Sequence, residues 1–175
     1  MEENVDIHSS EFDIRYMEAS DAPLLKEWLS LPEVRKWFPF SEDKEVDQAV
    51  QIWSGFSKYR CCLTADWKHE PCGMGILYLM PYRKVAHHCL TNFVVPPSMQ
   101  HQGIGGALLK NLKHLAKSYF RLEWIQIEVM ADSPVIALLK KHAFTEFARQ
   151  EMYFKREEGF IARVLMEADL RDGKK

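Results

Sequence analysis

A glycine-rich stretch that opens a helix carries the clearest chemical signal in this 175-residue chain. Residues 94–112 read VVPPSMQHQGIGGALLKNL, so that an apolar strand ends at two prolines and Gly103, Gly105 and Gly106 fall where the next helix begins. A helix start leaves backbone N–H groups without partners and carries a partial positive charge, and both features attract anions. Glycines let an anion approach these amides because they have no Cβ. The stretch predicts a phosphate site, with a glycine-tolerant helix start that binds nothing as the alternative.

Two common phosphate motifs are absent from this stretch. The dinucleotide fingerprint G-x-G-x-x-G fails because Leu108 stands where the third glycine is required. The phosphate loop that ends in Gly-Lys-Ser/Thr fails because no Gly-Lys pair occurs before Gly173. What remains is Gln100-x-x-Gly103-x-Gly105 with no acid in the first helical turn, which suits a negatively charged ligand.

Charge is distributed unevenly along the chain. Residues 71–122 contain no Asp or Glu, although the whole chain has 25 acidic residues. This segment is expected to offer a local site for a polyanion, with lysine-rich solvated helix faces as the alternative. The net charge of −2 gives no electrostatic reason to expect nucleic acid or an anionic membrane as a partner. The basic residues of the segment are Arg83, Lys84, Lys110, Lys113, Lys117 and Arg121.

Length and composition indicate one domain. With 47% hydrophobic and 27% charged residues, the chain can form one core with a solvated surface. We expect a domain over 12–170, with tails over 1–11 and 171–175. No secretory signal and no apolar run of roughly 20 residues is present, which favours a cytoplasmic protein. The cysteines lack C-x-x-C spacing and are expected to be reduced core thiols; they are Cys61, Cys62, Cys72 and Cys89.

Apolar periodicity predicts the elements that position the glycine-rich stretch. A strand over 87–95, a helix over 103–119 and a strand over 124–129 should form a right-handed parallel crossover. The whole order predicts a mixed sheet with helices packed on it, in the α/β (mixed α+β) class. Further strands are expected over 12–17, 61–67, 72–79, 144–149, 152–155 and 161–166. Further helices are expected from Ser20 or Asp21, over about 41–59 and from Asp132 or Ser133 to about 142, with a short helical or irregular segment over 33–38.

These segments together resemble the GCN5-related N-acetyltransferase (GNAT) family. NFVVPPSMQHQGIGGALLKNLKHLA followed by WIQIEVMADSPVIALLKKHAF is similar to the acetyl-CoA region of that family, including its Gln/Arg-x-x-Gly-x-Gly/Ala signature. The resemblance extends over roughly 12–170 and is strongest over 92–144. It implies a mixed sheet that is splayed between two central parallel strands and flanked by about four helices, with acetyl-CoA in the gap.

The resemblance also implies which residues hold the cofactor. Backbone groups of Phe93 to Val95 would pair with the pantetheine arm like an added strand, and amides around Gln102 to Gly106 would hold the pyrophosphate. The amide of Val94 or Val95 would stabilise the developing oxyanion. No metal is expected, because the pair His87–His88 has no third ligand at a recognisable spacing. The expected cofactor-binding set is Phe93, Val94, Val95, Gln100, His101, Gln102, Gly103, Ile104, Gly105, Gly106, Asp132 and Ser133.

Transfer of an acetyl group to an amine also requires a base. His88 is one candidate because the pKa of a histidine, about 6.5, suits proton removal at neutral pH. Only one of His87 and His88 can point into a cleft, since adjacent strand residues face opposite sides. Glu128 is the other candidate. A surface position without a catalytic role is the alternative for each.

The tyrosine that the family commonly places near the thiol is missing. When the pattern N-x-x-A-x-x-L-Y-x-x-x-G-F is aligned on Phe144, Leu139 falls at the tyrosine and Ala143 at the glycine. Leucine cannot protonate a departing thiolate, so either another group does so or the thiolate leaves unaided. The candidate substitutes are Tyr153, Tyr82 and Cys89.

Aromatic residues near the first helices complete the expected site. Trp37-Phe38-Pro39-Phe40 would wall a pocket for an apolar or aromatic amine, with burial in the core as the alternative. The sequence predicts an acetyl-CoA-dependent N-acetyltransferase, monomeric or homodimeric, that acts by direct attack in a ternary complex. Its acceptor is a primary amine on a small amine, an amino acid, an aminoglycoside-like molecule or a protein N-terminus. A non-catalytic acyl-CoA-binding sensor and a plain interaction domain are the alternatives.

Overall fold

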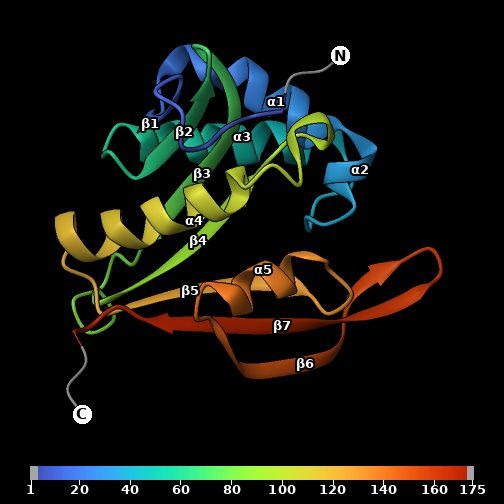
Figure 1. The fold of residues 1–175 in the computed structure, drawn as a ribbon. Coiled ribbons are helices and arrows are strands. Elements are labelled where there is room, and N and C mark those ends of the chain that lie inside the picture. Colours follow the sequence, from blue (N-terminus) through green and yellow to red (C-terminus); the bar gives the residue numbers. More distant parts are fainter. Residues whose placement is uncertain (1–3, 173–175) are drawn as a thin grey trace.

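The computed structural model describes residues 4–172, so the outermost parts of both expected tails, 1–3 and 173–175, lie outside the described residues. The strands are β1 (Phe12–Tyr16), β2 (Cys62–Trp67), β3 (Glu70–Leu79), β4 (His88–Val94), β5 (Trp124–Met130), β6 (Thr145–Arg156) and β7 (Gly159–Asp169) (Figure 1). The helices are α1 (Ala22–Ser30), α2 (Pro32–Arg35), α3 (Asp43–Ser57), α4 (Ile104–His114) and α5 (Val135–Lys141). Short 3-10 helices cover Ala19–Asp21 and Pro97–Met99, and a π-helical turn covers Leu115–Tyr119.

One seven-stranded sheet has the order β1-β2-β3-β4-β5-β7-β6. Its neighbouring strands are antiparallel except for β4 and β5, so the mixed sheet and the parallel crossover through α4 are confirmed. β4 and β5 pair only from His88–Trp124 to Leu90–Gln126, although both strands continue further. The two strands therefore separate toward their carboxyl ends, which is the splay that the family resemblance implies.

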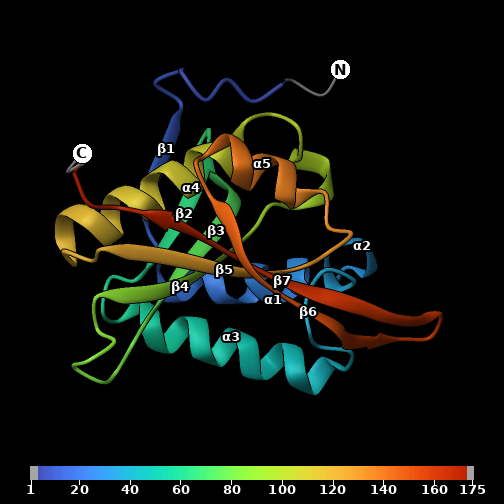
Figure 2. The same ribbon diagram turned by 90° about the horizontal axis from the view of Figure 1, so that it is seen from below.

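Helices cover both faces of the sheet and create two apolar cores (Figure 2). On one face, α1 and α3 bury Leu29 and Trp53 against Met74 of β3. On the other face, α4 and α5 bury Leu108 and Leu139 against the strands. Apolar residues recur every three or four positions in α4, so one side of this helix lies on the sheet and its first turn reaches the splayed ends of β4 and β5.

Two glycines in β3 allow α4 to approach the sheet closely. An added Cβ on Gly75 would lie 2.7 Å from Cδ1 of Leu112, and one on Gly73 would lie 2.9 Å from Cδ1 of Leu108. Gly73 also lies beside the register shift in β2 at Ala65. The sequence suggests a bulge or a close backbone approach at these glycines, and both are present.

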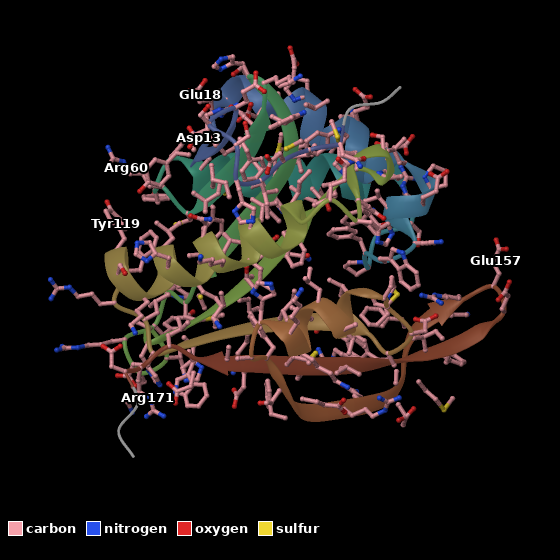
Figure 3. The ribbon with its side chains drawn as sticks, in the orientation of Figure 1. Asp13, Glu18, Arg60, Tyr119, Glu157 and Arg171 are labelled. Carbon is pink, nitrogen blue, oxygen red and sulfur yellow. The ribbon has the colours of Figure 1, made fainter. Side chains whose placement is uncertain are left out.

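The strands expected over 144–149 and 152–155 form a single strand, β6, with an irregular middle. Its register against β7 shifts between Gln150 and Phe154, and Met152 there has a left-handed φ of 54°. This local reversal interrupts the alternation along the sequence without ending the strand. β6 and β7 continue as a hairpin to Glu157, which lies at its tip (Figure 3).

The first described residues are part of the domain rather than a free tail. Val5 is only 7% exposed and belongs to the core beneath α4, and its amide donates a hydrogen bond to Oε1 of Gln102. Ile7 packs over Gly103. The expectation of a tail over 1–11 therefore fails for these two residues, because isolated apolar residues near a terminus give no local signal of long-range packing.

Candidate functional site

A cleft of about 340 Å³ opens where β4 and β5 separate. Its walls come from β4, β5, the first turn of α4, the start of α5 and the region of α2. The predicted site residues that line it are Phe93, Val94, Val95, Gln100, His101, Gly103, Gly105, Gly106, Glu128 and Ser133. Those that do not line it are His88, Gln102, Ile104, Asp132 and Tyr153.

The N-terminus of α4 presents its amides to this cleft. Gly103 caps the helix with a left-handed φ of 87°, a conformation that glycine adopts without a Cβ clash. No side chain of residues 4–172 caps the helix, and its first turn contains no acid. Gln100 braces the preceding loop through a hydrogen bond of 2.9 Å from Nε2 to the carbonyl of Val95. The helix start therefore has the features of an anion site and opens into a cleft.

The side chains of Gln102 and Ile104 do not line the cleft but support this loop from its other side. The Gln102 side chain turns away from the cleft, where Oε1 accepts a hydrogen bond from Val5 and Nε2 donates to the carbonyl of Ser98. The Ile104 side chain is buried in the core. At these two positions the backbone amide is what remains for a ligand.

The glycines of the first turn also allow α5 to pack against α4. An added Cβ on Gly105 would lie 3.2 Å from Cδ2 of Leu138, and one on Gly106 would lie 3.0 Å from Nε2 of His142. Burial, followed by the nearby cationic Lys113, lowers the pKa of His142. Part of the glycine requirement at 105 and 106 is therefore helix packing, independent of any ligand.

The free edge of β4 offers the Phe93 amide to the cleft. The Leu77 amide donates a hydrogen bond to the Cys61 carbonyl, so the backbone groups of Leu77 face β2. Backbone groups alternate between the two edges of an antiparallel strand, so those of Ile76 and Met74 face β4. The residues opposite these two, Asn92 and Val94, therefore direct their amides to β3.

The amide of Phe93 points the other way. It lies beyond the last residue that pairs with β5, and among the described residues it donates only to the adjacent Oδ1 of Asn92, at 2.9 Å. Of the two predicted oxyanion donors, Val94 is therefore excluded because its amide serves the sheet, and Phe93 becomes a candidate beside Val95. Sequence periodicity identifies the strand but not which edge a given amide faces.

Glu128 lies in the cleft with a charged partner. Its Oε2 accepts a hydrogen bond of 2.8 Å from Nη1 of Arg163, and Nη2 of the same guanidinium donates to Gln150. Tyr153 does not line the cleft but packs on Arg163, with the guanidinium carbon 3.9 Å from the ring centroid. Two of the predicted catalytic residues are thus joined through an arginine that the sequence did not single out.

His88 lies in the paired half of β4, away from the cleft. Its ring stacks on Trp124 with centroids 6.3 Å apart. Val94 is six positions further along the strand than His88, which is a distance of roughly 20 Å. His88 is therefore withdrawn as the base. The proposed proton donors Cys89 and Tyr82 do not line the cleft either, and burial raises the pKa of Cys89 to about 12.

The predicted pair at the start of α5 divides between two roles. Ser133 is buried and lines the cleft, and its Oγ accepts a long hydrogen bond of 3.4 Å from the amide of Val135. Asp132 lies outside and forms an ion pair with Arg156 at 2.7 Å. The guanidinium of Arg156 also lies 5.5 Å from the ring centroid of Trp37, so it links the β6–β7 hairpin to the region of α2.

Leu139, which takes the place of the family's tyrosine, is fully buried in the core. Its neighbour Leu138 lines the cleft instead. Ala143, at the glycine of the pattern, has a left-handed φ of 65° just after α5. None of the residues from 4 to 172 that line the cleft is a tyrosine or a cysteine.

The end of the cleft near α2 contains Glu33 and Val34 as well as the expected Trp37 and Phe38. The aromatic residues are half-buried, and Phe38 stacks on Phe40 with ring centroids 5.2 Å apart. The lining residues that sequence reasoning missed are Glu33, Val34, Asn92, Ile127, Val129, Pro134, Val135 and Leu138. An acid just before an aromatic cluster is the one local signal that was available.

The basic segment 71–122 does not form the wall of this cleft. None of its six Lys and Arg side chains is among the described lining residues. Lys113 instead donates to the carbonyl of His142, and Lys117 pairs with Asp172. The structure thus favours the alternative of solvated helix faces for most of this segment.

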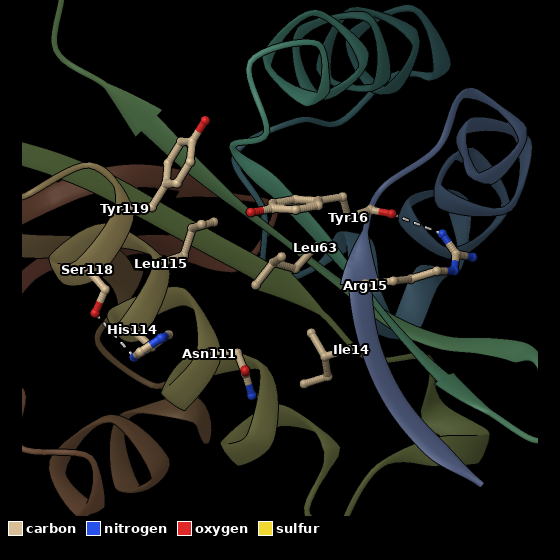
Figure 4. Close-up of a pocket in the computed structure, with 9 residues that line it drawn as sticks. All are labelled: Ile14, Arg15, Tyr16, Leu63, Asn111, His114, Leu115, Ser118 and Tyr119. Carbon is tan, nitrogen blue, oxygen red and sulfur yellow. Dashed lines mark hydrogen bonds between the residues drawn. The ribbon is translucent and has the colours of Figure 1, made fainter. Parts of the chain in front are cut away.

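A second hollow of about 420 Å³ lies on the far side of α4, between its last turns and β1 (Figure 4). Tyr16, Leu63 and Tyr119 border it, and His114 is hydrogen-bonded there to Ser118. It shares no lining residue with the cleft. Within residues 4–172, no cluster of three metal-ligating side chains occurs, and no helix is both long and apolar enough to cross a bilayer.

Within residues 4–172, a mixed sheet opens between two parallel strands beside a helix whose start has no side-chain cap, and this arrangement defines an α/β fold with a cleft at that point. The model of the Acetyltransferase (GNAT) family matches residues 22–144, which is more than half of the chain. The protein therefore belongs to the GNAT family of acetyltransferases. No curated protein matches the chain.

Solved structures show the same fold at low sequence identity. yncA from Salmonella typhimurium, determined with its cofactor acetyl-CoA, has a TM-score of 0.79 and 14% identity, with 95% of this chain and 98% of that chain covered. A GNAT acetyltransferase from Streptococcus pneumoniae has a TM-score of 0.73 and 20% identity, with 91% of this chain and 99% of that chain covered. A ribosomal-protein-alanine N-acetyltransferase from Brucella melitensis has a TM-score of 0.76 and 16% identity, with 90% of this chain and 99% of that chain covered.

Proposed function

We propose that this protein transfers the acetyl group of acetyl-CoA to a primary amine by direct attack in a ternary complex. The observation that carries the proposal is the uncapped start of α4, whose amides open into a cleft between two separated parallel strands. A domain over 12–170, to which the packed residues Val5 and Ile7 also belong, completes the proposal; it acts in the cytoplasm as a monomer or homodimer, without nucleic acid or membrane as a partner.

The cleft fits the cofactor in two places. The amides of Gly103 to Gly106 would hold the pyrophosphate, since they have no side-chain cap among the described residues. The free edge of β4 at Phe93 and Val95 would pair with the pantetheine arm as an added strand does. Acetyl-CoA supplies the acetyl group on a thioester, whose C–S bond breaks as the N–C bond to the amine forms.

Glu128 is the proposed base. It is the ionisable residue that lines the cleft on β5, and Arg163 holds its carboxylate in place. Glu128 would accept a proton from the ammonium, directly or through a water molecule, and pass it to solvent. The amide of Phe93 would donate to the thioester oxygen as negative charge develops there, in exchange for its bond to Asn92. The second proton of the ammonium ends on the coenzyme thiolate.

The alternative of an acyl-CoA-binding sensor rests on a specific observation. Leu139 is buried, and the described lining contains no tyrosine or cysteine that could protonate a thiolate. A sensor would bind acetyl-CoA tightly and show no turnover with any amine. An enzyme whose thiolate leaves unaided would turn over.

A coenzyme A release assay across a panel of amines tests the proposal. The control variant replaces His101, which is exposed, lines the cleft and lies beside the anion site. His101→Glu should raise KM for acetyl-CoA about tenfold, because a like charge near the diphosphate costs on the order of 1 kcal/mol, and His101→Gln should not. Gly105→Glu would be a less specific test, because its added side chain would also meet Leu138. Equal KM for His101→Glu and His101→Gln would remove the cofactor from this loop.

A further inference from the structure

The charged side chains that line the cleft have one sign. Among the residues of 4–172 that line it, Glu33 and Glu128 are the charged side chains, and none is lysine or arginine. The arginines near this end of the cleft are each already paired with a carboxylate: Arg35 with Asp43, Arg156 with Asp132, and Arg163 with Glu128. An anion that entered here would meet no free cation in the lining.

Glu33 is the carboxylate that remains available to a ligand. It is exposed at the start of α2, and no basic side chain of the described chain forms an ion pair with it. The nearby Lys36 lies over the ring of Trp37, with Nζ 5.1 Å from the centroid. An ammonium in the cleft would therefore find Glu33 and Glu128 from two different elements.

The rest of this end of the cleft is apolar. Val34 is 4% exposed, and Trp37 and Phe38 are half-buried beside it. Aromatic walls of this kind bury large apolar area and stack on planar groups. The lining thus combines two carboxylates with an aromatic surface.

We propose that the acceptor is a primary amine on an apolar or aromatic body with no carboxylate beside the amine. This inference rests on the proposed acetyl transfer and names its substrate class. Free amino acids are disfavoured because their carboxylate would lie near Glu33 and Glu128 without a cation to receive it, and like charges brought together suppress a wrong partner. Amines and amino-acid amides carry the same ammonium without that charge.

Three compounds that differ in one group test the inference: phenethylamine, phenylalaninamide and phenylalanine. Their binding to the protein saturated with coenzyme A is measured by calorimetry, which requires no turnover. Phenylalaninamide and phenethylamine are expected to bind at least about tenfold more tightly than phenylalanine. Glu33→Gln should reduce the ratio of the Kd of phenylalanine to that of phenylalaninamide, and Glu33→Lys should reduce it further. Glu27→Gln, at an exposed acid of α1 outside the cleft, should leave the ratio unchanged.

Each outcome separates the inference from the function on which it rests. Equal or tighter binding of phenylalanine, or an unchanged ratio in both Glu33 variants, overturns the substrate class while the acetyltransferase proposal stands. Binding of coenzyme A with none of the three compounds overturns the substrate class as well. Failure to bind coenzyme A at all overturns the proposed function, and the inference falls with it.

Discussion

Oε2 of Glu128 lies 2.8 Å from Nη1 of Arg163, across the pair of strands that forms one wall of the cleft. The same guanidinium donates to Gln150 and stacks on Tyr153. β5, β6 and β7 thus jointly hold one carboxylate at the point where the strands separate. A carboxylate held in this way keeps one position without a rigid loop around it.

Replacement of Glu128 should separate its chemical role from its structural one. Glu128→Gln is expected to lower kcat by at least about a hundredfold, because general-base catalysis contributes roughly 10²–10⁴ in rate. Glu167→Gln is the matched control, since Glu167 lies on the same pair of strands and bonds to Gln126. Initial rates at saturating acetyl-CoA measure the effect. Similar rates for the two variants would exclude Glu128 as the base.

Proline substitutions should distinguish the two edges of β4. Phe93→Pro removes an amide that the ladder with β3 does not use, so the protein should fold, with kcat about a hundredfold below that of Phe93→Ala. Val94→Pro removes an amide that faces β3 and should prevent folding. Circular dichroism and the coenzyme A release assay give the two readouts. If Phe93→Pro matches Phe93→Ala in kcat, the oxyanion donor lies elsewhere.

Ala143 is expected to be a site of backbone strain. Its φ of 65° costs an alanine roughly 1–2 kcal/mol that a glycine avoids, and the greater freedom of glycine in the unfolded chain offsets part of this gain. Ala143→Gly should therefore raise the free energy of unfolding by about 0.5–1 kcal/mol. Ala137→Gly, within α5, should lower it by about 1 kcal/mol. Urea titrations measure the change in the free energy of unfolding for each variant, and the two changes must have opposite signs.

Asp21 forms a buried polar centre beside the core on the α1 and α3 face of the sheet. Its carboxylate accepts hydrogen bonds from Arg15, from the Glu18 amide and from Thr64, and it is only 4% exposed. Burial by itself would raise the pKa of Asp21, but these hydrogen bonds, led by that from Arg15, outweigh burial and lower it. The charged carboxylate is consequently the form that the folded state requires.

This centre should make folding sensitive to acid. A carboxylate whose folded pKa lies below its unfolded value of about 3.9 stabilises the fold fully above that pH, and this contribution is lost as the pH falls through the folded pKa. Asp21→Asn should lower the free energy of unfolding at neutral pH by about 3 kcal/mol, since Arg15 loses a buried partner. The difference from the unsubstituted protein should shrink below about pH 4. A difference that stays constant with pH would contradict the assignment.

The cofactor loop could be recognised from the sequence because its signal is local. A strand that ends in prolines, a first helical turn without acids and the glycines at 103, 105 and 106 all lie within a few residues of one another. Strand and helix periodicities likewise placed β4, α4 and β5 and predicted their parallel crossover. The exceptions have a common cause: the irregular β6 and the buried Val5 depend on contacts with distant strands and helices.

The sequence by itself determined the family, the mixed sheet and the position of the glycine-rich helix start, since each of these depends on short-range spacing. The tertiary structure alone decided that Glu128 rather than His88 reaches the cleft, that the amide of Phe93 rather than that of Val94 faces away from β3, and that Glu33 lines the cleft. These outcomes depend on where two strands separate and on which elements meet at that point. Such relations join residues far apart in the chain, and no local pattern encodes them.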